Sequence, residues 1–117
     1  VYTIEGKTFF TFGGAASIDK VMRVEGISWW SREEANMNDI INAENNLAKC
    51  NFTVDYIVTH TIPMELIKSI SLFSYKVYPC ATAQFLDSVK ESVSYDKWFS
   101  GHFHMDACFP DDRVFIL

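Results

Sequence analysis

The pattern of apolar and polar positions predicts two short strands at the start of the chain. β-Branched and aromatic residues are concentrated in 1–5 and 8–12, and Gly6-Lys7 separates the two runs. Such runs on either side of a two-residue connection with glycine are typical of a β-hairpin. The segment 13–17 that follows holds only glycine and small residues, so its backbone can approach another part of the chain closely. We expect a hairpin followed by a loop inside a domain.

Apolar residues at helical spacing predict three helices further along the chain. Ser31 and Glu34 have the spacing of a capping box, and apolar residues on one face follow them. A Thr82 cap is expected to begin the last helix. The expected helices cover 32–49, 65–72 and 82–93.

Strand-type runs lie between and after these helices. The first of them, 54–59, ends at His60, and Pro63 prevents it from continuing. The tail predicts a closing hairpin around 110–112. The other expected strands cover 97–100, 105–109 and 113–117. The fold class is therefore α/β, with a mixed sheet and flanking helices.

Composition limits the chain to one packed domain with a modest core. Of its 117 residues, 49% are hydrophobic and 15% are aromatic. The net charge of −5 lacks the basic surface expected of a general DNA or anionic-membrane binder. No apolar run reaches the roughly 18 residues of a membrane span. The cysteines Cys50, Cys80 and Cys108 are too far apart for a CxxC pair, so we expect a reducing, cytoplasmic location and a free, buried Cys108 thiol.

All three histidines are expected where a strand meets a loop. His60 ends one strand run, and His102 and His104 follow another in the segment Gly-His-Phe-His. Ligands collect at the carboxyl ends of strands in open α/β folds, so the two strand ends could meet at one point. In an extended segment, His102 and His104 would share a face and could grip a metal. Structural histidines held by hydrogen bonds are the alternative.

The order of several motifs along the chain resembles the second half of a calcineurin-like metallophosphoesterase. The resemblance covers nearly the whole chain, and its most specific part is a strand-ending histidine followed by a proline and then, later, by Gly-His-x-His. The motifs are Gly13-Gly14-Ala15-Ala16-Ser17-Ile18-Asp19-Lys20, Arg23, Trp29-Trp30, Glu33-Glu34, Asp55-Tyr56-Ile57-Val58-Thr59-His60-Thr61-Ile62-Pro63 and Trp98-Phe99-Ser100-Gly101-His102-Phe103-His104-Met105-Asp106.

The resemblance implies a fold, an activity and a set of site residues. The family fold is a four-layer α/β sandwich, and a hydroxide that bridges two divalent metal ions (Mn, Fe or Zn) attacks phosphate mono- or diesters. His60 and His102 would bind one metal ion, and His104 would bind the other. Arg23 would meet the substrate phosphate, although an ordinary surface ion pair is as good an interpretation of that residue. The implied class is a hydrolase, a metal-binding phosphatase.

The chain also departs from the family. The D-x-H, G-D-x-x-D and G-N-H-D/E motifs of the family's first half are absent from the sequence, so residues 1–117 correspond to its carboxyl-terminal half and should be inactive alone. We expect a partner, either the missing half or another copy in a homodimer or strand-exchanged oligomer. The alternative function is a non-catalytic binding or oligomerisation module, since half a sandwich leaves an apolar sheet face bare. A solvated helix face explains four acidic residues: Glu33, Glu34, Glu44 and Glu91.

Overall fold

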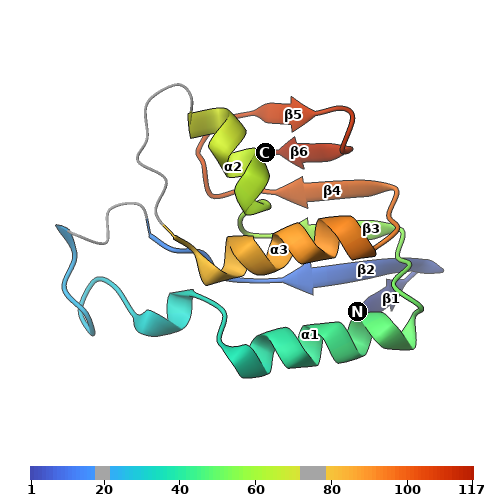
Figure 1. Cartoon of the computed structure of the whole chain (residues 1–117), viewed down its shortest axis with the longest axis horizontal. Helices are drawn as coiled ribbons and strands as arrows, with labels where there is room; N and C mark the ends of the chain where they lie inside the picture. The colour runs from blue at the N-terminus through green and yellow to red at the C-terminus, as the bar shows by residue number, and fades with distance from the viewer. Residues whose placement is uncertain (18–21, 72–78) are drawn as a thin grey trace.

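The strands form one mixed sheet in the computed structural model, which describes residues 1–17, 22–71 and 79–117 (Figure 1). In the described residues its strand order is β1-β2-β3-β4-β6-β5. The inner strands β2, β3, β4 and β6 are parallel, and β1 and β5 pair antiparallel at the two edges. The strands are β1 (Tyr2–Ile4), β2 (Lys7–Phe12), β3 (Tyr56–Thr59), β4 (Lys97–Ser100), β5 (Ala107–Phe109) and β6 (Val114–Ile116). The predicted α/β class and mixed sheet are confirmed.

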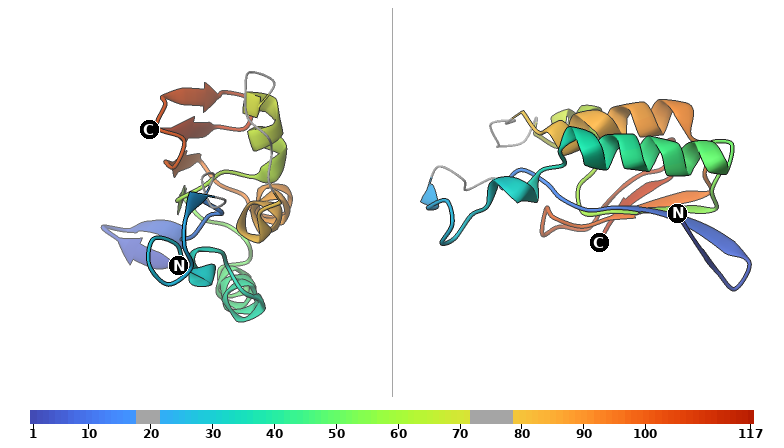
Figure 2. Two further views of the ribbon diagram at one scale, coloured as in Figure 1. Left: turned by 90° about the vertical axis from the view of Figure 1, so that its left-hand side faces the viewer. Right: turned by 90° about the horizontal axis from the view of Figure 1, so that it is seen from below.

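The described helices α1 (Met37–Lys49), α2 (Met64–Ser71) and α3 (Ala81–Ser92) lie on one face of the sheet, as the right-hand view of Figure 2 shows. The core lies between these two layers. Ile57 and Trp98 from the central strands are completely buried there with Leu86 of α3. None of the helices in the described part of the chain is long and apolar enough to cross a membrane. Residue 72 of the helix expected over 65–72 lies outside the described residues.

The opening hairpin forms one residue earlier than the sequence predicted. Ile4 pairs with Lys7, so the turn is Glu5-Gly6 instead of Gly6-Lys7. Both turn residues have positive φ (48° and 77°), as the type I′ turns that suit hairpins require. The closing hairpin of β5 and β6 is confirmed with shorter strands than expected.

The helix predicted over 32–49 begins five residues later, at Met37. Residues Ser31–Glu33 form a 3-10 turn, and the helix cap is Asn36, whose side chain accepts hydrogen bonds from the amides of Asn38 and Asp39. The Ala35 amide donates to Thr82 Oγ1 (2.9 Å), so a contact distant in sequence holds this stretch out of the helix. Thr82 is therefore not the predicted cap of α3, which begins at Ala81 with Thr82 buried.

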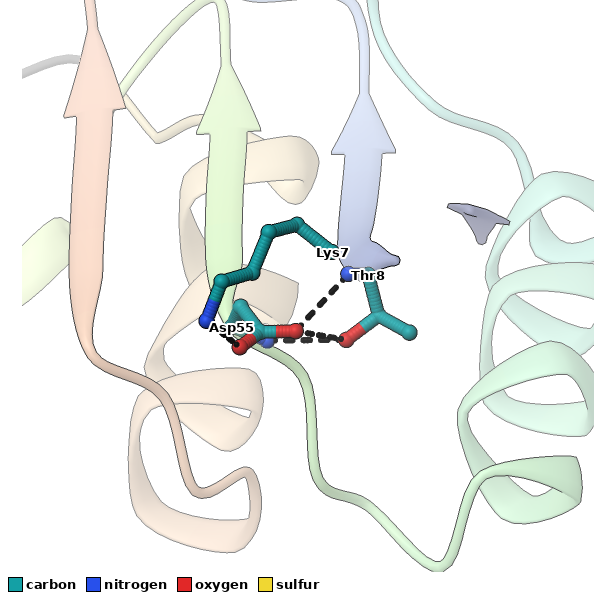
Figure 3. Close-up of polar contacts among 3 residues, drawn as sticks. All are labelled: Lys7, Thr8 and Asp55. Atoms are coloured by element: carbon teal, nitrogen blue, oxygen red, sulfur yellow. Dashed lines mark hydrogen bonds and ion pairs between the residues drawn. The ribbon is translucent and has the colours of Figure 1, made fainter. Parts of the chain in front are cut away.

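A carboxylate at the start of β3 fixes how β3 aligns with β2 (Figure 3). Asp55 accepts hydrogen bonds from the amide and hydroxyl of Thr8, each at 2.8 Å, and pairs with Lys7 Nζ at 2.9 Å. The Thr8 amide is the main cause that lowers the Asp55 pKa to about 2. Because this anchor sets the parallel register, the carboxyl ends of both strands, Phe12 and Thr59, lie side by side.

Candidate metal centre

Two histidines follow directly on the carboxyl ends of neighbouring strands. Thr59 of β3 pairs with Ser100 of β4, so His60 and the Gly101-His102 segment leave the sheet at the same edge. The Phe12 carbonyl accepts the His60 amide (3.3 Å), and the His60 carbonyl accepts the Gly101 amide (3.2 Å). The parallel pairing therefore brings together two residues that lie far apart in the sequence, as predicted from their strand-end positions.

The two imidazoles are in direct contact. His60 Nε2 lies 3.0 Å from His102 Nδ1, and the ring planes are 69° apart. The N–H of one ring can donate a hydrogen bond to the nitrogen of the other, or the lone pairs of both nitrogens can point at one cation. Two nitrogens at about 2.0–2.1 Å from a tetrahedral zinc ion lie roughly 3.3 Å apart. The pair therefore fits two neighbouring positions on one divalent ion with little movement.

The surroundings of His102 favour its neutral form. Burial is the main cause that lowers its pKa, and the nearby His60 and His104 act in the same direction, against a hydrogen bond to the Ala16 backbone. A protonated imidazole has no lone pair left for a metal, so the neutral form is the one that coordinates. The setting of His102 therefore suits a ligand.

His104 lines the same cavity, but the backbone conformation that places it there differs from the predicted one. The segment after β4 is bent instead of extended, and His102 and His104 both have positive φ, at 75° and 52°. The prediction that the two share the face of an extended segment is therefore wrong. Non-glycine residues in this conformation are strained, and such strain is concentrated at functional sites. His104 is exposed, and the described residues contain no group of three His, Cys, Asp or Glu side chains with metal-binding geometry.

The three histidines line one cavity with Arg23. The cavity has a volume of about 480 Å³, and its other lining residues come from the small-residue loop and the 3-10 turn: Gly14, Ala15, Ser17 and Glu33. Arg23 is exposed and donates from Nη1 to the Ser28 carbonyl (3.0 Å). Asp19 and Lys20 of the same motif lie outside the described residues. The structure thus places all four predicted site residues on one cavity of a size that small ligands occupy.

Glu33 is the cavity residue that sequence reasoning assigned to a solvated helix face. It is half-buried, and its carboxylate accepts a hydrogen bond from Ser17 Oγ at 2.5 Å. Its backbone carbonyl accepts the Ala15 amide at 2.8 Å. The close approach needs Gly14, where φ is +91° and an added Cβ would lie 2.5 Å from the Glu33 carbonyl oxygen. The small-residue loop was the available signal, and its predicted close approach to another segment is confirmed.

Of the two predictions about the cysteines, the structure confirms one. All three are free, as expected, but Cys108 is exposed because alternation along the edge strand β5 turns it away from the core, so its predicted burial is wrong. Cys80 is the buried thiol near the site, and its sulfur accepts the Ala16 amide at 3.3 Å.

The candidate site is thus a paired imidazole at two strand ends, with His104, Arg23 and Glu33 around a shared cavity. Comparison of this chain with protein-family models, curated proteins and solved structures finds no match. The case for a function therefore depends on this geometry and on the motif order.

Proposed function

We propose that this chain is the carboxyl-terminal half of a calcineurin-like, metal-dependent phosphoesterase that hydrolyses phosphate mono- or diesters. The observation that carries the proposal is the 3.0 Å approach of His60 Nε2 to His102 Nδ1 within a cavity that His104 and Arg23 also line. Imidazole nitrogens bind Mn, Fe and Zn, so the donor set does not select one ion.

Each residue has a distinct part in this proposal. His60 and His102 hold one divalent ion, and His104 holds a second. When bound, two such ions would supply the nucleophile and offset the negative charge on the phosphate oxygens. Arg23 binds the phosphate oxygens, for which a guanidinium is suited. The other ligands come from D-x-H, G-D-x-x-D and G-N-H segments outside this sequence, so these 117 residues hold metal weakly and are inactive alone.

Hydrolysis by the full-length protein tests the proposal. With added manganese it should cleave p-nitrophenyl phosphate or bis-p-nitrophenyl phosphate, and His102→Ala should lose the activity and one bound metal ion. Glu91→Gln, which changes an exposed carboxylate on α3, is the matched control and should retain both. Absence of turnover in the metal-loaded protein, or an unchanged His102→Ala variant, contradicts the proposal.

One observation favours a second candidate function, a non-catalytic module for binding or oligomerisation. The sheet face opposite the described helices carries a row of aromatic rings from Phe9, Tyr56, Phe99 and Phe115, with successive ring centroids 5.1, 6.4 and 5.7 Å apart. Val58 on the same face is 40% exposed. A contiguous apolar surface of this kind is typical of a protein interface.

Sedimentation velocity tests this second function on Val58→Lys. If copies of the chain associate through this face, the wild type sediments as a dimer and Val58→Lys as a monomer. Ile41→Lys, at an exposed apolar position on α1, is the control and should remain dimeric. A monomeric wild type contradicts self-association.

A further inference from the structure

We infer that Glu33 is a specificity residue whose carboxylate accepts hydrogen bonds from hydroxyl groups on the alcohol portion of the phosphoester. The inference rests on the proposed phosphoesterase function and names its substrate class. Such substrates are polyol phosphates, in contrast to plain alkyl or aryl phosphates.

The structure holds Glu33 in place through contacts that leave part of its carboxylate available. The backbone carbonyl makes the close contact with the small-residue loop, where it accepts the Ala15 amide. The carboxylate accepts Ser17 Oγ at 2.5 Å and, at a long 3.4 Å, the Trp30 amide. A carboxylate has about four acceptor positions, so these two contacts within the described part of the chain leave room for a ligand.

The position of Glu33 is unexpected for a site that only binds phosphate. A carboxylate repels phosphate oxygens, yet Glu33 lines the same cavity as the three histidines and Arg23. A carboxylate binds either a cation or a hydrogen-bond donor, and the proposed function assigns the cations to the histidines, so a donor is the ligand left for Glu33. The positive charge of Arg23 disfavours an ammonium donor in the same cavity. A neutral hydroxyl is therefore the donor that is compatible with both the Glu33 carboxylate and the Arg23 guanidinium. Ser17 already presents a hydroxyl to this carboxylate.

The cavity is large enough for a hydroxyl-bearing alcohol portion as well as the phosphate of a substrate. Its volume of about 480 Å³ lies within the range of small-molecule sites, and Gly14 and Ala15 add little bulk to its wall. A phosphate at the histidines would place its alcohol portion within the same cavity as Glu33. Charge-assisted hydrogen bonds to a carboxylate are about twice as strong as neutral ones. A substrate with hydroxyl groups should therefore bind more tightly than one without them.

Two substrates that differ only in their hydroxyls test the inference. For the full-length protein, kcat/KM is measured with manganese, and the calorimetric Kd without added metal, for sn-glycerol 3-phosphate and for propyl phosphate. The wild type should prefer glycerol phosphate by about tenfold or more in both quantities. Glu33→Gln should lose most of this preference. Glu34→Gln, whose carboxylate contacts the Ala81 amide instead, should keep it.

The outcomes separate the two claims. Hydrolysis of both compounds without preference, or a preference that persists in Glu33→Gln, overturns the inference and leaves the phosphoesterase intact. Preferential binding of glycerol phosphate without hydrolysis of either compound or of p-nitrophenyl phosphate overturns the enzyme instead. If neither compound binds, the inference is wrong, and the phosphoesterase is wrong as well only if p-nitrophenyl phosphate and bis-p-nitrophenyl phosphate are not hydrolysed either.

Discussion

Replacement of Gly14 by alanine should open the wall of the histidine cavity. Gly14 has a φ of +91°, and a Cβ there would lie 2.5 Å from the Glu33 carbonyl oxygen. That oxygen belongs to the backbone and cannot rotate away as a flexible side chain would. The loop must therefore move, and with it the Ala15 amide that donates to Glu33.

The structure gives the size of the effect. A left-handed backbone costs a residue with a Cβ about 1–2 kcal/mol more than glycine. Loss of the Ala15 hydrogen bond adds about 1 kcal/mol, so the free energy of unfolding should fall by about 2–3 kcal/mol. With a urea dependence of about 1–3 kcal/mol per molar, the unfolding midpoint should fall by about 0.7–3 M.

Urea denaturation followed by tryptophan fluorescence measures this change. Gly13→Ala is the matched control, because an added Cβ there meets nothing within 4 Å, and its midpoint should move far less. Gly14→Ala should also weaken metal binding relative to Gly13→Ala, since the loop lines the cavity of the histidines. Equal midpoints and equal metal affinities for the two variants would refute the reasoning.

Two further predictions concern stability. Because the Asp55 pKa is lowered from 3.8 to about 2, chiefly by the Thr8 amide, its stabilisation is present above pH 3.8 and is lost as the pH falls toward 2. Asp55→Asn should therefore destabilise the protein at pH 7 and reduce the loss of stability between about pH 4 and 2. The control Asp111→Asn, at an exposed turn, should keep the wild-type stability at pH 7. A wild-type acid profile in Asp55→Asn contradicts this. In Trp98→Phe the buried Thr59 hydroxyl loses the indole donor at 2.7 Å, so the free energy of unfolding should fall by about 1–3 kcal/mol. A change in urea titrations smaller than about 0.5 kcal/mol, the lower end for one hydrogen bond, would exclude that role.

The sequence was sufficient for the element types and for the strand ends that carry the histidines. It misplaced the start of α1 because Ser31-x-x-Glu34 and Asn36-x-x-Asp39 both have the spacing of a cap. Local pattern cannot choose between them. The contact from Ala35 to Thr82, 47 residues away, makes the choice in the folded chain.

The site was predictable only where it follows from strand ends. His60 and His102 meet because β3 and β4 are parallel neighbours, which the alternation of strands and helices favours. The bent backbone at His102 and His104 has no such pattern, since histidine signals a positive φ far less strongly than glycine does. Glu33 was missed because its position depends on Gly14 and Ser17, which precede it in another segment.

The central claim is that His60 and His102 bind one cation through the two nitrogens that face each other. Nitrogen-15 NMR of the imidazole rings, recorded during a zinc titration, tests this claim. If the two rings share one ion, large coordination shifts should appear at His60 Nε2 and His102 Nδ1 at the same zinc equivalent, with the other nitrogen of each ring remaining protonated. Ring nitrogens that do not change with zinc, or that shift at different equivalents, would contradict it.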